Sequence, residues 1–274
     1  MKPEDFNLLS GLLRERSGLV LTPDKGYLLE SRLVPLARKH GMAGLDDLVS
    51  AIRSKLNEPL LRDITEAMTT NESFFFRDTK PFDNFRKIVL PALLQAREAQ
   101  KRIRIWCAAC SNGQEPYSLA MILREEAARL NGWRVEIVGT DISREVLQKA
   151  LSGIYSQFEV QRGLPIQLLV KYFAKVGEMW QVDPSLRAMV QFKELNLLRP
   201  FGELGVFDVV FCRNVLIYFD QAAKADVLQR IAQMMPQDGF LFLGGAETVI
   251  GVTDKFVPHK TERSIYTPAG RTAH

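Results

Sequence analysis

The sequence lacks long apolar runs, and this absence excludes a protein with membrane-spanning helices. No stretch of its 274 residues approaches the ~18–20 uninterrupted apolar residues that such a helix requires. The amino terminus carries Glu4 and Asp5 ahead of any apolar stretch, so a cleavable signal sequence is not expected. With three cysteines, the chain also lacks the framework of a disulfide-rich secreted domain. We therefore expect a cytoplasmic protein that does not insert into membranes.

The sequence is also short of net charge. Lys and Arg number 36 and Asp and Glu 32, which leaves a net charge of +4 at pH 7. An excess so small and so evenly spread gives no indication of nucleic-acid binding. Hydrophobic residues make up 46% of the chain, the composition of a globular protein with a sizeable core.

The first part of the chain shows only helical patterns. Thr22 and Pro23 have the residue types of a helix start, and amphipathic segments follow at 45–55 and 59–68. No stretch here alternates with the period of a strand. The pattern predicts a small all-helical domain of four helices over residues 1–80.

From about Lys101 onward, short apolar runs alternate with helical stretches. Five runs are predicted strands: Ile103–Ala108, Val135–Asp141, Met189–Leu195, Phe207–Cys212 and Phe240–Gly244. This alternation implies an α/β domain over residues 81–274, with a mostly parallel sheet covered on both faces. We expect an edge hairpin from 255–259 and 264–267, and a small inserted β element at about 163–190.

The strongest local motif follows the first predicted strand, in CAACSNGQEPYSLAM. The strand leads into a turn of small residues and then a helix near Pro116, where an α/β sheet binds ligands through backbone N–H groups. The turn differs from the G-x-G-x-x-G of dinucleotide sites because Gly113 is its one glycine, and Glu115 would repel a pyrophosphate. The motif favours a cationic or amino-bearing ligand, although an ordinary strand-to-helix turn explains it equally well.

Asp141 ends the second predicted strand, in the segment GTDIS. An acid at this position is placed to accept hydrogen bonds from both hydroxyls of a ribose. Asp is also a favoured helix N-cap, and taken alone that role is the simpler explanation. Together with the preceding small-residue turn, Asp141 favours a nucleoside-bearing ligand without phosphates.

Cys107 and Cys110 form a C-x-x-C pair, which suggests either zinc or redox chemistry. A structural zinc site needs four ligands, and only Cys212 and three scattered histidines remain. Because Cys107 falls inside the predicted strand, we expect these thiols to be buried as small apolar residues, and we expect no metal site.

Two further segments combine aromatic and polar residues. TTNESFFFRDTKPF (69–82) suits either a hydrophobic clamp between the two domains or a pocket wall whose aromatic rings attract a cation. FCRNVLIYFD (211–220) has Arg213 and Asn214 at the carboxyl end of a strand, where open α/β sheets hold their sites. A loop with a helix cap is an equal alternative for the second segment.

Four motifs together closely resemble the CheR family of chemotaxis receptor methyltransferases; in chain order they are TTNESFFFR, CAACSNGQEPYSLAM, GTDIS and FCRNVLIYFD. The resemblance implies a Rossmann-like class I methyltransferase domain that uses S-adenosylmethionine (SAM) and releases S-adenosylhomocysteine (SAH). It also implies a small all-helical N-terminal domain and an inserted antiparallel β-subdomain. The implied activity is methyl esterification of glutamate side chains on the cytoplasmic helices of chemoreceptors, by a protein expected to be a monomer.

The resemblance also implies roles for individual residues. Cofactor contacts are implied for Asn71, Ser73, Arg77, Glu115, Asp141, Asn196, Leu197, Arg213 and Asn214. Glu115 would meet the amino group of the cofactor and Asp141 its ribose, while Asn196 and Leu197 would border the adenine.

The resemblance places Arg77 and Tyr218 nearest the transferred methyl group. A glutamate substrate needs no general base, because its reference pKa of about 4.3 leaves it ionised at pH 7. Arg77 is expected to orient the incoming carboxylate, and Tyr218 to aim it or to face the sulfonium.

Receptor helices in this family are acidic at their methylation sites, so a basic helix face is a candidate docking surface. Its residues are Arg32, Arg38, Lys39, Arg53 and Lys55. Glu30 and Asp46 intervene, and a solvated helix face is an equal alternative.

Two other functions stay open from the sequence. A non-catalytic adaptor would keep the fold, but the retention of both the acidic and the basic motif residues argues against it. A methyltransferase for a small molecule would have no need of the N-terminal helices or the β insert.

Overall fold

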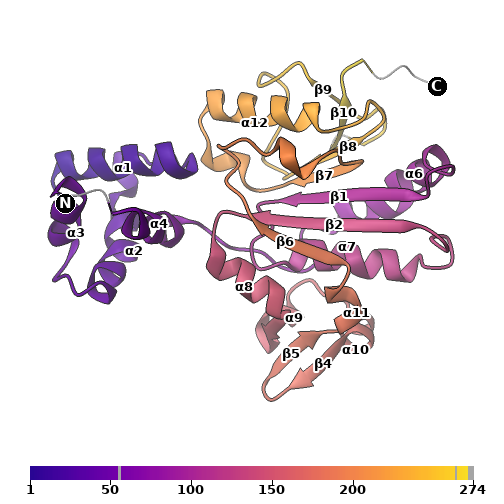
Figure 1. Ribbon diagram of the computed structural model, residues 1–274, viewed down its shortest axis with the longest axis horizontal. Helices are drawn as coiled ribbons and strands as arrows, with labels where there is room; N and C mark the ends of the chain where they lie inside the picture. The colour runs from indigo at the N-terminus through magenta and orange to yellow at the C-terminus, as the bar shows by residue number, and fades with distance from the viewer. Residues whose placement is uncertain (55–56, 263, 271–274) are drawn as a thin grey trace. The chain divides into compact units, whose positions relative to one another are not determined.

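A computed structural model describes residues 1–54, 57–262 and 264–270, and the chain divides into two compact units (Figure 1). The first, here called the helical unit, comprises Met1–Thr70 and Tyr218–Lys224. The second, here called the α/β unit, comprises Asn71–Ile217 and the chain from Ala225 onward. Among the described residues, no helix has both the length and the apolar character to cross a membrane.

In the described part of residues 1–70, four α-helices build the helical unit. They are α1 (Pro3–Ser17), α2 (Gly26–Lys39), α3 (Leu45–Ser54) and α4 (Glu58–Met68), and a short 3-10 helix, η1 (Pro23–Lys25), precedes α2. Their apolar faces share one core that includes Leu9 and Ile64. The predicted four helices are confirmed. The second begins at Gly26, later than predicted, because the residues after Thr22 form the separate 3-10 turn.

Seven strands form the main sheet of the α/β unit, in the order β6-β2-β1-β7-β8-β10-β9 (Figure 1). The strands are β1 (Arg102–Ala108), β2 (Arg134–Asp141), β6 (Val190–Glu194), β7 (Val209–Cys212), β8 (Phe240–Leu243), β9 (Phe256–Pro258) and β10 (Ile265–Pro268). The first five are parallel, as predicted. β10 is antiparallel to both β8 and β9, so the predicted terminal hairpin is present and β10 joins it to the sheet.

Helices cover the main sheet, and its central strands are buried on both faces. The helices after the helical unit are α5 (Lys80–Asn84), the π-helical η2 (Phe85–Val89), α6 (Leu90–Ala96), α7 (Gln114–Glu125), α8 (Arg144–Ser152), α9 (Gln157–Gln161), α10 (Ile166–Tyr172), α11 (Pro184–Arg187) and α12 (Gln221–Gln233), with 3-10 turns η3 (Gly202–Leu204) and η4 (Leu216–Tyr218). Of these, α9 and α10 pack against a smaller second sheet. Along β1, Ile105 and Cys107 join the core that contains α7, whereas Trp106 packs against Phe201 and Phe207. Successive strand residues point to opposite faces, so this alternation shows that both faces are covered.

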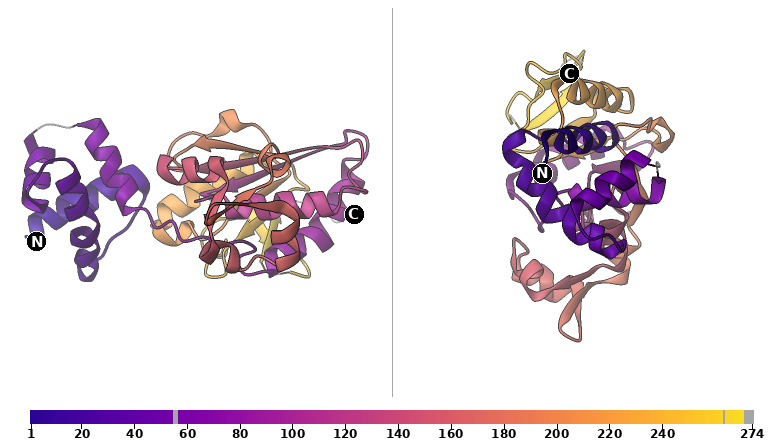
Figure 2. Two further views of the ribbon diagram at one scale, coloured as in Figure 1. Left: turned by 90° about the horizontal axis from the view of Figure 1, so that it is seen from below. Right: turned by 90° about the vertical axis from the view of Figure 1, so that its left-hand side faces the viewer.

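A second, antiparallel sheet of three strands has the order β3-β5-β4. Its strands are β3 (Ile154–Ser156), β4 (Phe173–Val176) and β5 (Met179–Val182). β3 lies before the stretch in which the sequence predicts β structure. It was not predicted because three residues give too short an apolar pattern. The views in Figures 1 and 2 agree that the β4–β5 hairpin lies at the end of the α/β unit away from β9 and β10.

Candidate functional site

Backbone in the left-handed region forms the turn between β1 and α7. Ala109, Ser111 and Gly113 have φ values of 56°, 51° and 85°. A side chain at Gly113 would bring its Cβ within 2.8 Å of the Cβ of Ala150, so only glycine fits. Two non-glycine residues in this conformation mark a strained turn of the kind that gathers at functional sites.

Asp141, at the end of β2, is buried and holds this turn. Its Oδ2 accepts the N–H of Ser111 at 2.8 Å, and its Oδ1 accepts the N–H of Ser143 at 3.0 Å. The N-cap residue of α8 is Ser143, so the N-cap explanation for Asp141 is wrong. Asp141 instead ties the carboxyl end of β2 to the turn after β1.

The segment that begins at Asn71 runs beside the same turn. The carbonyl of Asn71 accepts a hydrogen bond from the Ser111 hydroxyl at 2.8 Å. The N–H of Phe76 donates to the hydroxyl of Ser118, on α7, at 3.0 Å. Ser73, which lies between these two anchors, is half-buried. The segment is therefore attached at both ends to the turn and to the helix that follows it.

The phenylalanines of this segment have different surroundings. Phe75 is fully buried and meets Tyr155 and Phe173 edge-on, with ring centroids 5.0 and 5.5 Å away. It belongs to the core of the α/β unit and is not a pocket wall. Phe74 is half-buried, and the guanidinium carbon of Arg77 lies 5.5 Å from its ring centroid. The guanidinium carbon of Arg162 lies nearer, at 4.3 Å, so the cations beside this ring are arginines of the chain itself.

Arg213 is the charged centre of the site and is buried. Its Nη1 donates to Glu115 Oε2 at 2.8 Å, and its Nη2 donates to Asp78 Oδ2 at 2.6 Å and to the carbonyl of Arg77 at 3.0 Å. One guanidinium therefore joins the end of β7, the start of α7 and the segment after Asn71. Arg213 Nε and Gln114 Oε1 are among the buried side-chain atoms of the described residues that have no hydrogen-bond partner, as are Arg187 Nε and Ser264 Oγ elsewhere.

Glu115 sits in an environment that disfavours its charge. Burial raises the pKa of Glu115, and the adjacent guanidinium of Arg213 opposes this rise without cancelling it. A carboxyl group with a raised pKa beside a specific cation is typical of functional sites. The position suits a ligand that brings a second positive charge.

Asn196 and Leu197 follow the carboxyl end of β6. Asn196 Oδ1 accepts the N–H of Leu198 at 2.9 Å, and Leu197 is buried. The N–H of Leu195 donates to the carbonyl of Asp141 at 2.8 Å, which links this segment to the end of β2. The predicted cofactor residues of β2, β6, β7 and α7 thus gather at one edge of the sheet.

Tyr218 differs from the other predicted site residues because it belongs to the helical unit. The residue is half-buried, and its carbonyl accepts the N–H of Val20 at 3.0 Å. Arg14 also donates to Asp220 in the same unit, at 2.7 and 3.0 Å. These contacts hold the segment that follows η4.

The predicted basic face contains two kinds of residue. Arg32 donates to two carbonyl groups at the end of α4, at 2.8 and 3.0 Å, and Arg53 pairs with an aspartate of α1 at 2.9 Å. Arg38 and Lys39 are exposed at the end of α2. Lys55 lies outside the described residues. Arg32 and Arg53 thus have structural contacts within the helical unit.

All three cysteines are free and buried, and Cys107 lies in β1 as predicted. Burial raises the pKa of each thiol well above its usual value, which makes these thiols unreactive near neutral pH. No group of three or more His, Cys, Asp or Glu side chains in the described ranges is arranged to hold a metal ion.

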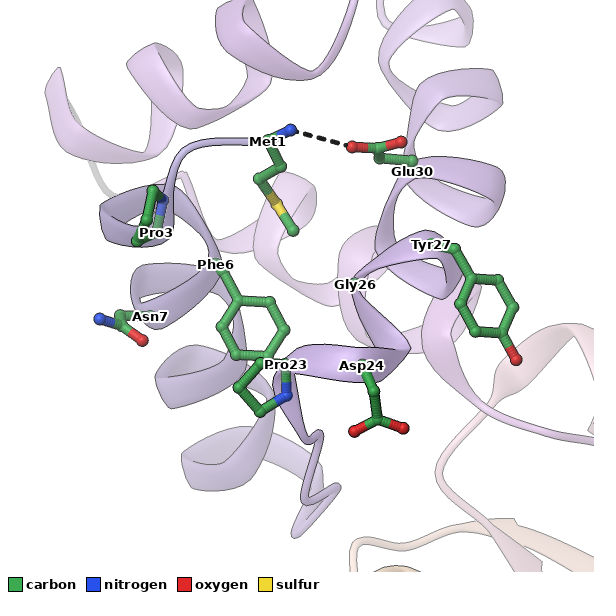
Figure 3. A pocket seen from close by; sticks show the side chains of 9 residues that line it. All are labelled: Met1, Pro3, Phe6, Asn7, Pro23, Asp24, Gly26, Tyr27 and Glu30. Carbon is green, nitrogen blue, oxygen red and sulfur yellow. Dashed lines mark hydrogen bonds and ion pairs between the residues drawn. The ribbon is translucent and has the colours of Figure 1, made fainter.

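A hollow of about 400 Å³ lies in the helical unit (Figure 3). It is lined by Met1, Pro3, Phe6, Asn7, Pro23, Asp24, Gly26, Tyr27 and Glu30. The amino group of Met1 lies 3.1 Å from a carboxylate oxygen of Glu30. The hollow contains none of the site residues predicted from the sequence.

Three polar residues at this edge of the sheet were not predicted from the sequence. Asp78 binds Arg213, Ser118 binds the backbone of Phe76, and Glu247 accepts N–H groups after β7 and β8. The available signal for Glu247 was its place directly after the segment Gly-Gly-Ala, where a predicted strand ends. Asp78 and Ser118 lie inside recognised motifs and carry no separate signal.

Two family models match the chain. The model described as "CheR methyltransferase, SAM binding domain" matches residues 71–265, and "CheR methyltransferase, all-alpha domain" matches residues 4–69. Their boundary falls where the helical unit meets the α/β unit along the chain.

Relatives align over nearly the whole chain. It is 43% identical over 256 residues to chemotaxis protein methyltransferase 1 of Pseudomonas aeruginosa, covering 92% of this chain and 93% of the relative. It is 40% identical to chemotaxis protein methyltransferase Cher2 of Pseudomonas putida, with the same coverage. The chemotaxis protein methyltransferase of Escherichia coli is 34% identical, covering 92% of this chain and 86% of the relative.

Proposed function

Because the chain belongs to the CheR methyltransferase family, we propose that it transfers the methyl group of SAM to glutamate side chains on chemoreceptor helices, forming methyl esters. Its SAM-binding domain and its relatives identify it as a methyltransferase of chemotaxis. The observation that carries the proposal is the buried junction in which Arg213 joins Glu115 to the segment of Arg77.

The chemistry of the site residues suits SAM. Its methionyl part carries an ammonium and a carboxylate, which Glu115 and Arg213 complement in charge. Buried polar groups normally have hydrogen-bond partners, so Arg213 Nε and Gln114 Oε1 are groups that a ligand would satisfy. Asp141 and Asn196, at the ends of neighbouring strands, are proposed to contact the nucleoside.

A glutamate substrate fits a site without a general base. SAM supplies a methyl group on a positively charged sulfur, and a glutamate carboxylate is already ionised at pH 7. The protein therefore needs to orient the carboxylate and to exclude water. Arg77 is half-buried and is held by a hydrogen bond from its Nη1 to the carbonyl of Glu72 at 2.8 Å, which supports the proposed role in orienting the carboxylate. Tyr218 is proposed to aim the carboxylate or to face the sulfonium.

The decisive experiment is methyl transfer from labelled SAM to receptor-containing membranes. We expect label on the receptor, released by base, because a methyl ester hydrolyses where an amide or amine product does not. Label on a small molecule, or base-stable label on the receptor, would contradict the proposal. SAH binding, measured by calorimetry, separates an enzyme from an adaptor that has lost the cofactor.

We also propose that Arg38 and Lys39 help to dock the acidic receptor helix, since both are exposed and, within the described part of the chain, neither side chain is bonded to the fold as Arg32 is. Reversing both charges to Glu should raise the KM for the receptor by roughly 3- to 10-fold at low salt, and less at high salt. The same reversal at Lys87, an exposed lysine of the α/β unit, is the control. An unchanged KM in the double variant would remove this docking role.

A further inference from the structure

We propose that Glu247 is a positioning residue, which fixes the backbone after β7 so that Arg213 and Asn214 can bind the cofactor. This inference rests on the proposed function in that both residues are taken as cofactor contacts. Glu247 lies in the segment that follows β8, and 9% of the residue is exposed.

The carboxylate of Glu247 accepts four backbone N–H groups. Oε2 accepts those of Gly244 at 2.7 Å and Asn214 at 2.8 Å. Oε1 accepts those of Val215 at 2.9 Å and Ile217 at 3.2 Å. Three of these donors belong to the segment after β7, whose N–H groups have left the sheet and need other partners. One side chain therefore replaces the hydrogen-bond ladder just where the strand ends.

The local backbone needs such a restraint. Asn214 has a φ of 59°, a left-handed conformation that is unfavourable for a non-glycine residue and persists only where its surroundings impose it. A Cβ at Gly244 would lie 2.7 Å from Glu247 Oε2 and 2.8 Å from Asn214 Nδ2. Only glycine lets the segments after β7 and β8 approach closely enough for the carboxylate to join them.

The restraint reaches the cofactor residues through one peptide bond. Arg213 precedes Asn214 directly, and its Nη1 must stay 2.8 Å from Glu115 while its Nη2 reaches Asp78. Glu247 takes part in none of these hydrogen bonds, although its negative charge lies near enough to Glu115 to add to the rise in the pKa of that carboxyl group. If the segment after β7 relaxed, the guanidinium of Arg213 would lose its alignment, although every charged group of the site would still be present.

Asp208 offers a matched control at the other end of β7. Its Oδ2 accepts the N–H of Arg104 at 2.8 Å, and its Oδ1 accepts a hydrogen bond from Arg97 at 2.9 Å. Its side chain is 13% exposed. Asp208→Asn therefore removes another largely buried carboxylate that accepts a backbone N–H group, at the end of β7 where no predicted cofactor residue lies.

The test compares Glu247→Gln with Asp208→Asn in the full chain, by calorimetric titration with SAH and by denaturant unfolding. Both variants should lose stability. In each, an NH2 group replaces one carboxylate oxygen, and it cannot accept the hydrogen bonds that this oxygen accepted. We expect Glu247→Gln to weaken SAH binding at least tenfold, and Asp208→Asn to leave it within twofold of the wild type. Glu247→Asp, which keeps the charge on a shorter side chain, should fall between Glu247→Gln and the wild type.

Wild-type SAH affinity in Glu247→Gln, with stability lowered as in Asp208→Asn, would overturn the positioning role and leave a purely structural one. If Glu247→Gln does not fold, Gly244→Ala decides the question, because its methyl group pushes Glu247 and Asn214 apart and should weaken SAH binding in the same way. SAH binding needs no receptor, so either result stands apart from the outcome of the receptor methylation assay.

Discussion

Arginine–carboxylate clusters lie at both ends of the parallel strands, here called the amino edge and the carboxyl edge of the sheet. The clusters differ in whether every guanidinium nitrogen donates a hydrogen bond. At the amino edge, all three guanidinium nitrogens of Arg97 donate, to Asp208 and Asp238 at 2.6–2.9 Å. Arg104 likewise uses all three, for Glu136 and two carbonyl groups. At the carboxyl edge, Arg213 donates through Nη1 and Nη2, and its buried Nε has no partner among the described residues.

The pKa values of the carboxyl groups at the two edges shift in opposite directions. Burial pushes the pKa of Glu136 upward, but hydrogen bonds from Arg104 and Arg102 outweigh it, so that the pKa is lowered overall. Burial raises the pKa of Glu115, and Arg213 fails to cancel the rise. A complete ion-pair cluster stabilises the folded chain, whereas an incomplete one at a strained turn is prepared for a charged ligand.

The largest effect is expected at the incomplete cluster. Arg213→Ala removes the cation that joins Glu115 to the segment of Arg77, and it leaves a buried carboxylate without this partner. SAH affinity should fall at least 100-fold, about 2.7 kcal/mol of binding free energy, as measured by calorimetry. A variant that folds and binds SAH within threefold of the wild type would show that Arg213 serves only the fold.

Arg97→Ala should lower the stability of the fold and leave SAH binding intact, the opposite of the result expected for Arg213→Ala. It removes hydrogen bonds to two carboxylates at the amino edge, so the free energy of unfolding should fall by about 2–3 kcal/mol in denaturant titration. SAH affinity of the folded variant should stay unchanged. A substantial loss of affinity would break the distinction between the two edges.

The smallest effect is a pH dependence of cofactor binding. A protonated Glu115 does not attract an ammonium group, so SAH affinity should weaken as the pH falls through the raised pKa of Glu115, by at most about tenfold per pH unit. Binding in that range should release a proton, because the ligand favours the ionised carboxylate. Calorimetry from about pH 5 to about pH 8 measures both quantities.

Two variants make the pH experiment specific. Glu115→Gln should bind SAH more weakly and with no such pH dependence. Glu136→Gln, which changes the carboxyl group with the lowered pKa, should keep the pH dependence of the wild type. An identical pH profile in Glu115→Gln would assign the dependence to another group.

The regular elements of this protein were largely predictable from local sequence. Apolar periodicity located the four helices and the five parallel strands, because each buries one face or both faces in a core. The strand Ile154–Ser156 was missed because three residues carry too little pattern. The last residues of the inserted β element expected at about 163–190 instead contain the end of α11 and the start of β6.

The residues of the candidate site were found through motifs. Motifs indicate charged side chains near strand ends, but they do not indicate a side chain whose partners are backbone groups elsewhere in the chain. Glu115, Asp141 and Arg213 stood out as charges next to strand ends. Glu247 did not, because its partners are N–H groups of residues that are distant in sequence. The sequence also offered no way to separate Arg32 from Arg38, whose difference depends on carbonyl groups at the end of α4.

By itself, the sequence determined that an all-helical part precedes an α/β part, the order of the motifs and the family to which the chain belongs. These depend on short-range periodicity and on residue types at fixed spacing. Only the tertiary structure decided which arginines are fully bonded and which carboxyl group has a raised pKa. Those properties arise from burial and from partners brought together from separate strands, which no local pattern encodes. The small net charge of +4 is therefore uninformative about function, whereas the contacts that Arg213 makes with Glu115 and Asp78 at the carboxyl ends of the strands are informative.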